Sequence, residues 1–257
     1  MAIYLRQICL VADKLGPVMD DLEAVFGTPI CHVDPAVGKF GLENALMAFG
    51  TQFLEVVVPT QAGTAAGRYL ERRGGDGGYM VITQVREKAE QDVIRANAAA
   101  NGVRVAYDSD RGHWHLMQLH PGDMRAAFFE IEWDDVADVT GFWNPVGGTG
   151  WEDKVNTDLV SAITVAELQS DDPAGLAAHW AAVAGVAVQD RDGVPHVPFA
   201  NADLRFVQAV DGRGPGLGAL DVTAHDPDRI LAAAQQRGLA VSGHQVTICG
   251  TRFNLTG

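Results

Sequence analysis

Apolar residues recur in short runs along the chain, and three of these runs within residues 1–135 are interrupted by polar residues. Among the interrupting residues are Gln7 in the run 5–12, Glu55 in the run 52–59 and Glu130 in the run 126–133. A carboxylate in an apolar strand is costly to desolvate unless it is paired, protonated or bound to a cation. Because side chains alternate between the two faces of a strand, each of these residues shares a face with its second neighbours. The repeated pattern predicts a polar cavity lined by several strands.

The order of the predicted elements repeats four times as a strand, a helix and three further strands, and we refer to each repeat as a module. The modules are expected at residues 3–58, 79–133, 160–210 and 217–257. Their helices are expected at residues 13–27, 88–102, 172–185 and 226–238, where the apolar spacing is helical. A fourfold βαβββ repeat constrains the whole chain more than any single motif does.

One module alone would leave a face of its small sheet in water, so the modules are expected to pair. The segment 141–151, rich in Gly, Pro and Trp, is the predicted boundary between an N-terminal domain at 1–140 and a C-terminal domain at 152–257. The predicted fold class is therefore α+β, with four βαβββ modules paired into two domains. Each domain is expected to be a curved mixed β-sheet with its helices outside.

Composition excludes several classes of partner. The chain has 257 residues and a net charge of −14, so it lacks the basic surface that binds nucleic acid, and an anionic membrane would repel it. No apolar stretch approaches the ~20 residues that span a bilayer, and no N-terminal signal segment is recognisable. Three cysteines without a close pair argue against a disulfide framework and for a reducing compartment. A cytoplasmic location is expected.

The first module resembles the vicinal oxygen chelate superfamily, which includes glyoxalase I, bleomycin-resistance proteins and extradiol dioxygenases. The sequence LRQICLVADKLGPVMDDLEAVFG at 5–27 looks like the opening strand and helix of that fold, and QFLEVV at 52–57 looks like its closing strand. The resemblance extends over the chain as four units and is clearest in 1–135, which is similar to a glyoxalase-like domain. It implies that two modules enclose a cleft, where residues of the first and last strands hold a divalent metal ion.

The four positions that this resemblance assigns to a metal fall on Gln7, Glu55, Met80 and Glu130. Met80 departs from the pattern, because some glyoxalases have histidine there. One of His113, His115 and His120 could supply the missing imidazole, and His120 is the residue that we assign. The corresponding positions of the second half are poor metal ligands: Ala162, Phe206, Leu220 and Asn254.

The donor set limits the expected cofactor without identifying it. One glutamine and two glutamates offer only oxygen donors, which suit Mg, Mn or Ca better than Zn or Cu. Mg, Mn, Zn, Ni and Fe are nevertheless not distinguished by the sequence. A bound ion would polarise a substrate oxygen while Glu55 or Glu130, the predicted catalytic residues, moves a proton. The resulting prediction is an isomerase or lyase that acts next to a carbonyl group.

Aromatic and thioether side chains are expected to line the site of a small organic substrate, on which aromatic rings can stack. The predicted lining residues are Tyr79, Met80, Trp114 and Phe128, with Trp143 as a further candidate. The alternative function is a metal-free protein that binds and sequesters such a molecule and needs no cofactor. An extradiol dioxygenase is disfavoured, because Gln7 and Met80 stand where its two iron-binding histidines are expected. The sequence is also compatible with a homodimer.

Overall fold

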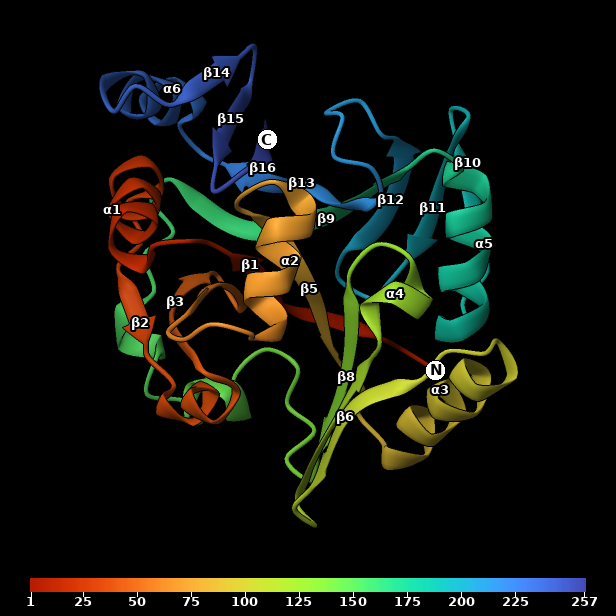
Figure 1. Ribbon diagram of the computed structural model, residues 1–257. Helices are drawn as coiled ribbons and strands as arrows, with labels where there is room; N and C mark the ends of the chain where they lie inside the picture. Colours follow the sequence, from red (N-terminus) through yellow and green to blue (C-terminus); the bar gives the residue numbers. More distant parts are fainter. The chain divides into compact units, whose positions relative to one another are not determined.

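The computed structural model describes all residues from 1 to 257 (Figure 1). The first module comprises β1 (Tyr4–Val11), α1 (Leu15–Phe26), β2 (Ile30–His32), the 3-10 helix η1 (Pro35–Phe40), β3 (Leu42–Phe49) and β4 (Gln52–Pro59). Helix α2 (Ala65–Arg73) follows. The second module comprises β5 (Gly77–Gln84), α3 (Lys88–Ala100), β6 (Val105–Asp110), β7 (Trp114–Leu119), the short helix α4 (Pro121–Met124) and β8 (Phe128–Asp134).

Two 3-10 turns, η2 (Asn144–Val146) and η3 (Glu152–Lys154), lead to the second half of the chain. The third module comprises β9 (Val160–Ser170), α5 (Pro173–Ala184), β10 (Gln189–Arg191), β11 (Val194–Pro198) and β12 (Asp203–Gln208). The fourth comprises β13 (Gly216–Ala224), α6 (Pro227–Gln236), β14 (Ala240–Ser242), β15 (Gln245–Ile248) and β16 (Thr251–Thr256). The predicted fourfold βαβββ repeat is confirmed.

The strands form two eight-stranded mixed sheets. Their strand orders are β2-β3-β4-β1-β5-β8-β7-β6 and β10-β11-β12-β9-β13-β16-β15-β14. In every module the first and last strands run parallel, and the remaining pairs are antiparallel. The α+β fold class, with modules one and two in one sheet and modules three and four in the other, is therefore confirmed.

Helix ends follow local sequence signals. The Asp172 and Asp226 side chains cap α5 and α6 by accepting backbone N–H groups, and each is followed by proline at the first helical position. Helix α1 ends at Gly27, whose φ of 68° is the left-handed conformation that favours glycine. Two helices add to the four-module repeat: the arginine-rich segment before Gly74 forms α2, and residues 121–124 form the short helix α4.

The chain forms two compact units that do not follow the order of the sequence. The first unit comprises Met1–Arg6, Tyr79–Val139 and Val165–Leu217, and the second comprises Gln7–Gly78, Thr140–Thr164 and Gly218–Gly257. The first unit thus holds most of modules two and three, and the second holds most of modules one and four, while the first strand of each module (β1, β5, β9 and β13) is divided between the units. The domain boundaries expected at 140 and 152 stay a prediction.

Each unit has its own aromatic core. In the first unit α3 packs on α5, and the ring of Phe129 lies 5.1 Å from the ring of Trp180. In the second unit α1 packs on α6, and the ring of Phe26 lies 5.4 Å from Phe49 and 5.1 Å from Phe253. Both cores form where the apolar faces of the helices pack against the strands of the sheets.

Within each unit, one side-chain amide binds both backbone groups of a residue in a first strand. The Gln52 amide donates to the Ile163 carbonyl and accepts from the Ile163 N–H, both at 2.8 Å. The Asn201 amide accepts from the Leu5 N–H at 2.8 Å and donates to the Leu5 carbonyl at 3.0 Å. Each amide therefore makes the hydrogen bonds that a neighbouring strand would otherwise make.

Candidate functional site

In the second unit, the Glu55 carboxylate of β4 is held by two amide side chains. The Gln7 amide of β1 donates to Glu55 Oε2 at 2.8 Å, and the Asn44 amide of β3 donates to Glu55 Oε1 at 2.5 Å. All three side chains are buried. Gln7 and Glu55 are thus brought together as the sequence predicts, and neutral N–H donors stabilise the carboxylate there.

The orientation of both amides is fixed by groups that can only donate hydrogen bonds. The indole N–H of Trp143 donates to Gln7 Oε1 at 2.9 Å, and the backbone N–H of Asp34 donates to Asn44 Oδ1 at 2.9 Å. Because both amide oxygens are used in this way, both amide nitrogens face Glu55. Donor chemistry therefore dictates which end of each amide meets the carboxylate.

In the first unit, the strand register places a row of carboxylates on the face of β7 and β8 that lies opposite α3. Glu130, Glu132 and Asp134 alternate along β8 and so share a face. The residues of β7 and β5 that pair with this row share the same face: Trp114, Leu116 and Gln118 on β7, and Met80, Ile82 and Gln84 on β5. Three of the predicted lining residues, Met80, Trp114 and Phe128, therefore share a face with Glu130.

Each carboxylate of this row accepts a hydrogen bond from a side chain. Gln118 donates to Glu130 at 2.6 Å, and the indole N–H of Trp114 donates to Glu132 at 2.6 Å. The Gln84 amide donates to Asp134 at 2.9 Å. Buried carboxyl groups need hydrogen-bond partners, and each member of the row has at least one.

Arg6 of β1 orients the end of this row. Its guanidinium donates to Gln84 Oε1 and to the Asp138 carbonyl, both at 2.7 Å. Because a guanidinium only donates, the Gln84 nitrogen is directed at Asp134. Burial lowers the pKa of Arg6 to about 10, although the nearby charges of Asp138, Glu132 and Asp134 oppose that shift. Arg6 remains charged at neutral pH and partly balances the carboxylates.

Burial also changes the acidity of the row. It raises the pKa of the Glu132 carboxyl well above its ordinary value, and the negative charge of Glu130 raises it further. Because Glu130 and Glu132 lie side by side on one strand face, their mutual repulsion favours a proton on one of the two carboxyl groups. Burial also raises the pKa of the Asp134 carboxyl, although hydrogen bonds from the backbone N–H groups of Ala137 and Val136 act to lower it.

The structure places the predicted fourth ligand in another role. His120 is partly exposed and caps α4, with its Nδ1 accepting the Gly122 N–H at 3.2 Å and lying 3.7 Å from Asp123. His115 pairs with Trp133 across the strands and so faces α3, away from the face of Glu130. The strand alternation therefore directs His115 away from Met80, and a role for His120 as the missing ligand stays a prediction.

The residues present do not fit a divalent metal ion. In neither unit do three or more histidine, cysteine, aspartate or glutamate side chains form a set that could hold one. In the second unit, the group of Gln7 that faces Glu55 is an amide nitrogen, which is not a metal donor. Glu130 belongs to the first unit, and its convergence with Gln7 and Glu55 stays a prediction.

Of the predicted aromatic residues, Trp114 has a direct polar role, since it binds Glu132. The rings of Tyr79 and Phe128 pack edge to face with their centroids 5.0 Å apart. Trp143 is fully buried and binds Gln7, so it acts as a hydrogen-bond donor of the site. A substrate-binding role for these rings stays a prediction.

Sequence reasoning missed Asn44, Glu132, Gln84 and Arg6 as members of these networks. Arg6 carried a signal, because a charged residue next to Gln7 in an apolar strand needs a buried partner. The second half also holds an unexpected polar chain, in which Gln245 donates to Asn254 and Asn254 donates to Asp221, both at 2.7 Å. Asn254, which the sequence predicts to be a poor metal ligand, is therefore part of a hydrogen-bonded network.

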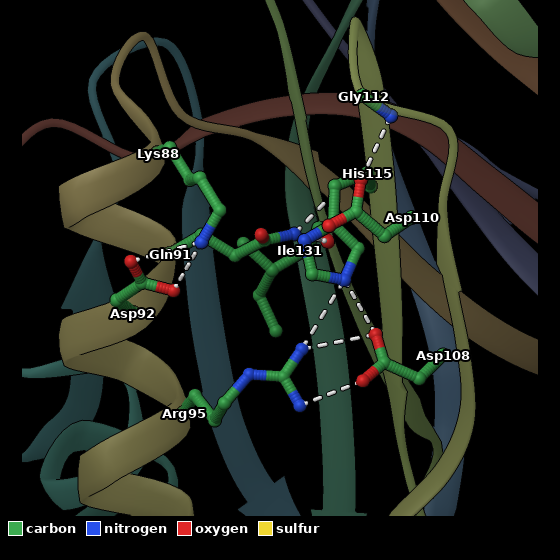
Figure 2. Close-up of polar contacts among 9 residues, drawn as sticks. All are labelled: Lys88, Gln91, Asp92, Arg95, Asp108, Asp110, Gly112, His115 and Ile131. Carbon is green, nitrogen blue, oxygen red and sulfur yellow. Dashed lines mark hydrogen bonds and ion pairs between the residues drawn. The ribbon is translucent and has the colours of Figure 1, made fainter.

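A further polar cluster on the α3 side fastens the helix to the sheet (Figure 2). His115 Nε2 lies 2.5 Å from Asp108, and Arg95 of α3 pairs with Asp108 at 2.8 Å. Burial alone would raise the pKa of Asp108, but hydrogen bonds from Arg95 and His115 outweigh it and hold that pKa below its usual value. The Gln91 amide donates to the backbone carbonyls of His115 and Ile131, as Figure 2 shows. These contacts hold β7 and β8 in position against α3.

None of the helices combines the length and the apolar composition that a membrane crossing requires.

No family model matches the chain, and no curated protein matches its sequence. Over its full length the chain is similar to the solved structure of a hypothetical protein from Staphylococcus aureus, with a TM-score of 0.66, 12% identity, and coverage of 100% of this chain and 99% of the other.

About half of this chain is similar to the solved structures of two methylmalonyl-CoA epimerases. A variant of the Streptomyces coelicolor enzyme in complex with 2-nitronate-propionyl-CoA has 20% identity and a TM-score of 0.46, and covers 54% of this chain and 99% of its own. The Mycobacterium tuberculosis enzyme has 17% identity and a TM-score of 0.43, and covers 51% and 87%. The full-length likeness shows the fold alone, as four βαβββ modules in two sheets.

Proposed function

We propose that the chain is a member of the vicinal oxygen chelate superfamily and a small-molecule enzyme of isomerase or lyase type. In this proposal it moves a proton at a carbon next to a carbonyl group of a small organic substrate. The observation that carries the proposal is the carboxylate row of β8, which shares one face with Met80, Trp114 and Phe128. Apolar and aromatic groups beside carboxylates are what binding and general acid–base chemistry on a small molecule require.

Glu130 is the proposed acid–base residue. It is buried, it is oriented by Gln118, and it lies beside Glu132 on the same strand face. Neighbouring carboxyl groups in a buried site differ in protonation, which gives one the role of base and the other the role of acid. Because the residues present do not fit a metal ion, the proposed proton transfer uses side chains of the chain alone. A role for Glu55 as a second catalytic residue, and a homodimer, stay predictions.

A hydrogen-exchange experiment tests the proposal across several classes of carbonyl compound at once. The protein is incubated in D2O with a panel of small 2-oxo acids, 2-hydroxy ketones and acyl thioesters, and deuterium incorporation next to the carbonyl is measured by mass spectrometry. The expected result is exchange of one panel class above the buffer rate, reduced by at least about 100-fold in Glu130→Gln. A matched control is Glu152→Gln, because Glu152 is exposed in η3. Exchange that is unchanged in Glu130→Gln would refute the assignment.

A second candidate function is metal-free sequestration of a small molecule. The observation that favours it is the Glu55 site, in which neutral amides satisfy the carboxylate and leave nothing that fits a metal. The same panel separates the two functions. Binding of a compound in calorimetry, without exchange of its protons in D2O, would support sequestration.

A further inference from the structure

In the second unit, the indole of Trp143 fixes the orientation of the Gln7 side chain at the Glu55 site. Trp143 lies just before η2 and is held there by its backbone, which donates to the Gly148 carbonyl at 3.1 Å and accepts from the Gly148 N–H at 2.9 Å. The tight loop that results directs the indole N–H at Gln7 Oε1. Both side chains are almost fully buried, with exposed fractions of 0% for Trp143 and 3% for Gln7.

A divalent cation between Gln7 and Glu55 would need the amide oxygen of Gln7 beside the carboxylate. Rotating that amide by half a turn would place its NH2 group against the indole N–H of Trp143. Two donors would then face each other in a buried place, which is unfavourable because two N–H groups cannot bind each other. The indole therefore opposes the rotamer that a metal ion requires.

Asn44 adds to the same effect. Its amide oxygen is used by the backbone N–H of Asp34, so its nitrogen also faces Glu55. The Glu55 carboxylate consequently lies between the amide N–H groups of Gln7 and Asn44, and the hydrogen bonds to both amide oxygens oppose rotation of these amides. A cation would have to displace at least one of them.

We propose that Trp143 is the specificity-determining residue of this site and keeps it free of divalent cations by fixing the orientation of Gln7. The inference concerns the second unit and does not depend on the acid–base role proposed for the first. Removal of the indole N–H releases the Gln7 amide, so that its oxygen and Glu55 can bind a cation together.

The test is the gain of Mn2+ binding in Trp143→Phe, which removes the donor and keeps an aromatic ring. Calorimetry and the electron paramagnetic resonance signal of free Mn2+ measure binding to metal-free protein. The variant is expected to bind about one Mn2+ per chain at least about 100-fold more tightly than the wild type. Combining it with Glu55→Gln is expected to abolish the gain. The matched control is Trp180→Phe, because Trp180 is equally buried in the first unit and donates to the Met124 carbonyl.

Circular dichroism shows first whether Trp143→Phe is folded. A folded variant that binds no Mn2+ overturns the inference, and so does a wild-type protein whose Mn2+ binding is lost in Glu55→Gln. Where Trp143→Phe does not fold, Gln7→Glu takes its place, because its carboxyl accepts the indole N–H with one oxygen and turns the other oxygen to Glu55. That variant is then expected to gain Mn2+, and its failure to bind overturns the inference.

Discussion

Truncation of Gln52 should destabilise the second unit strongly, because its amide is the partner of two buried backbone groups. The Ile163 N–H and carbonyl both bind it at 2.8 Å, and Gln52 itself is only 3% exposed. Gln52→Ala leaves both groups without a partner where water enters with difficulty. At about 1–3 kcal/mol for each unsatisfied buried group, the free energy of unfolding is expected to fall by about 2–6 kcal/mol.

Asn201→Ala is the matched comparison, because Asn201 makes the same two bonds to Leu5 but lies at the surface. Water can replace its amide, so the cost is expected to be only the net value of two hydrogen bonds, about 1–3 kcal/mol. Urea unfolding followed by circular dichroism and tryptophan fluorescence measures both losses. A loss for Asn201→Ala that equals or exceeds the loss for Gln52→Ala would refute the role assigned to burial.

The Gln52→Glu variant tests the direction of the two bonds. An ionised carboxylate accepts the Ile163 N–H but faces the Ile163 carbonyl with a second acceptor, whereas a protonated carboxyl can donate to it. The variant is therefore expected to be closer to wild-type stability at about pH 4 than at about pH 8. Equal destabilisation at both pH values would contradict the proposed donor and acceptor pattern.

Three further predictions concern other parts of the structure. The folded state raises the pKa of Glu132, so the stability that its protonated form provides is complete below about pH 4 and is lost as the pH rises toward the folded pKa. In urea unfolding, Glu132→Gln should therefore become more stable relative to the wild type between about pH 5 and about pH 8, and the opposite trend would contradict this reasoning. Asp108→Asn should weaken the attachment of α3 to β7 and speed hydrogen exchange of the β6–β7 amides, whereas Lys88→Ala, which removes an exposed i,i+4 pair, should leave exchange nearly unchanged. Gly50→Ala should prevent folding of the second unit or cost several kcal/mol, because a Cβ there would collide with the backbone carbonyl oxygen of Ser161 at a position with a φ of 65°, and a wild-type melting temperature would contradict the close approach.

The sequence predicted the fold class because each module repeats the same apolar periods. Runs such as 5–12 and 52–59 identify strands on their own, and Gly27 marks a helix end through its left-handed backbone. Helix α2 is not apparent from apolar spacing, because its segment is polar, with three of its nine residues arginine. Its cap, Thr64, was the available signal.

The candidate site was predictable only in part. The polar interruptions Gln7, Glu55 and Glu130 were expected to line one cavity, and the structure brings Gln7 and Glu55 together. Asn44 was not apparent, because an asparagine near a turn is ordinary in sequence and its partner lies on the neighbouring strand. The direction of the Gln7 amide was also beyond the sequence, since it depends on Trp143, which is 136 positions from Gln7.

The two compact units have a consequence for the integrity of the chain. Each unit contains residues from both sides of the 141–151 loop, since the first includes Tyr79–Val139 together with Val165–Leu217 and the second includes Gln7–Gly78 together with Gly218–Gly257. A proteolytic nick in that loop would therefore yield fragments that each hold half of two cores. Such fragments should remain associated after cleavage and reconstitute the protein when mixed, while either one expressed by itself should be recovered as an incompletely folded chain.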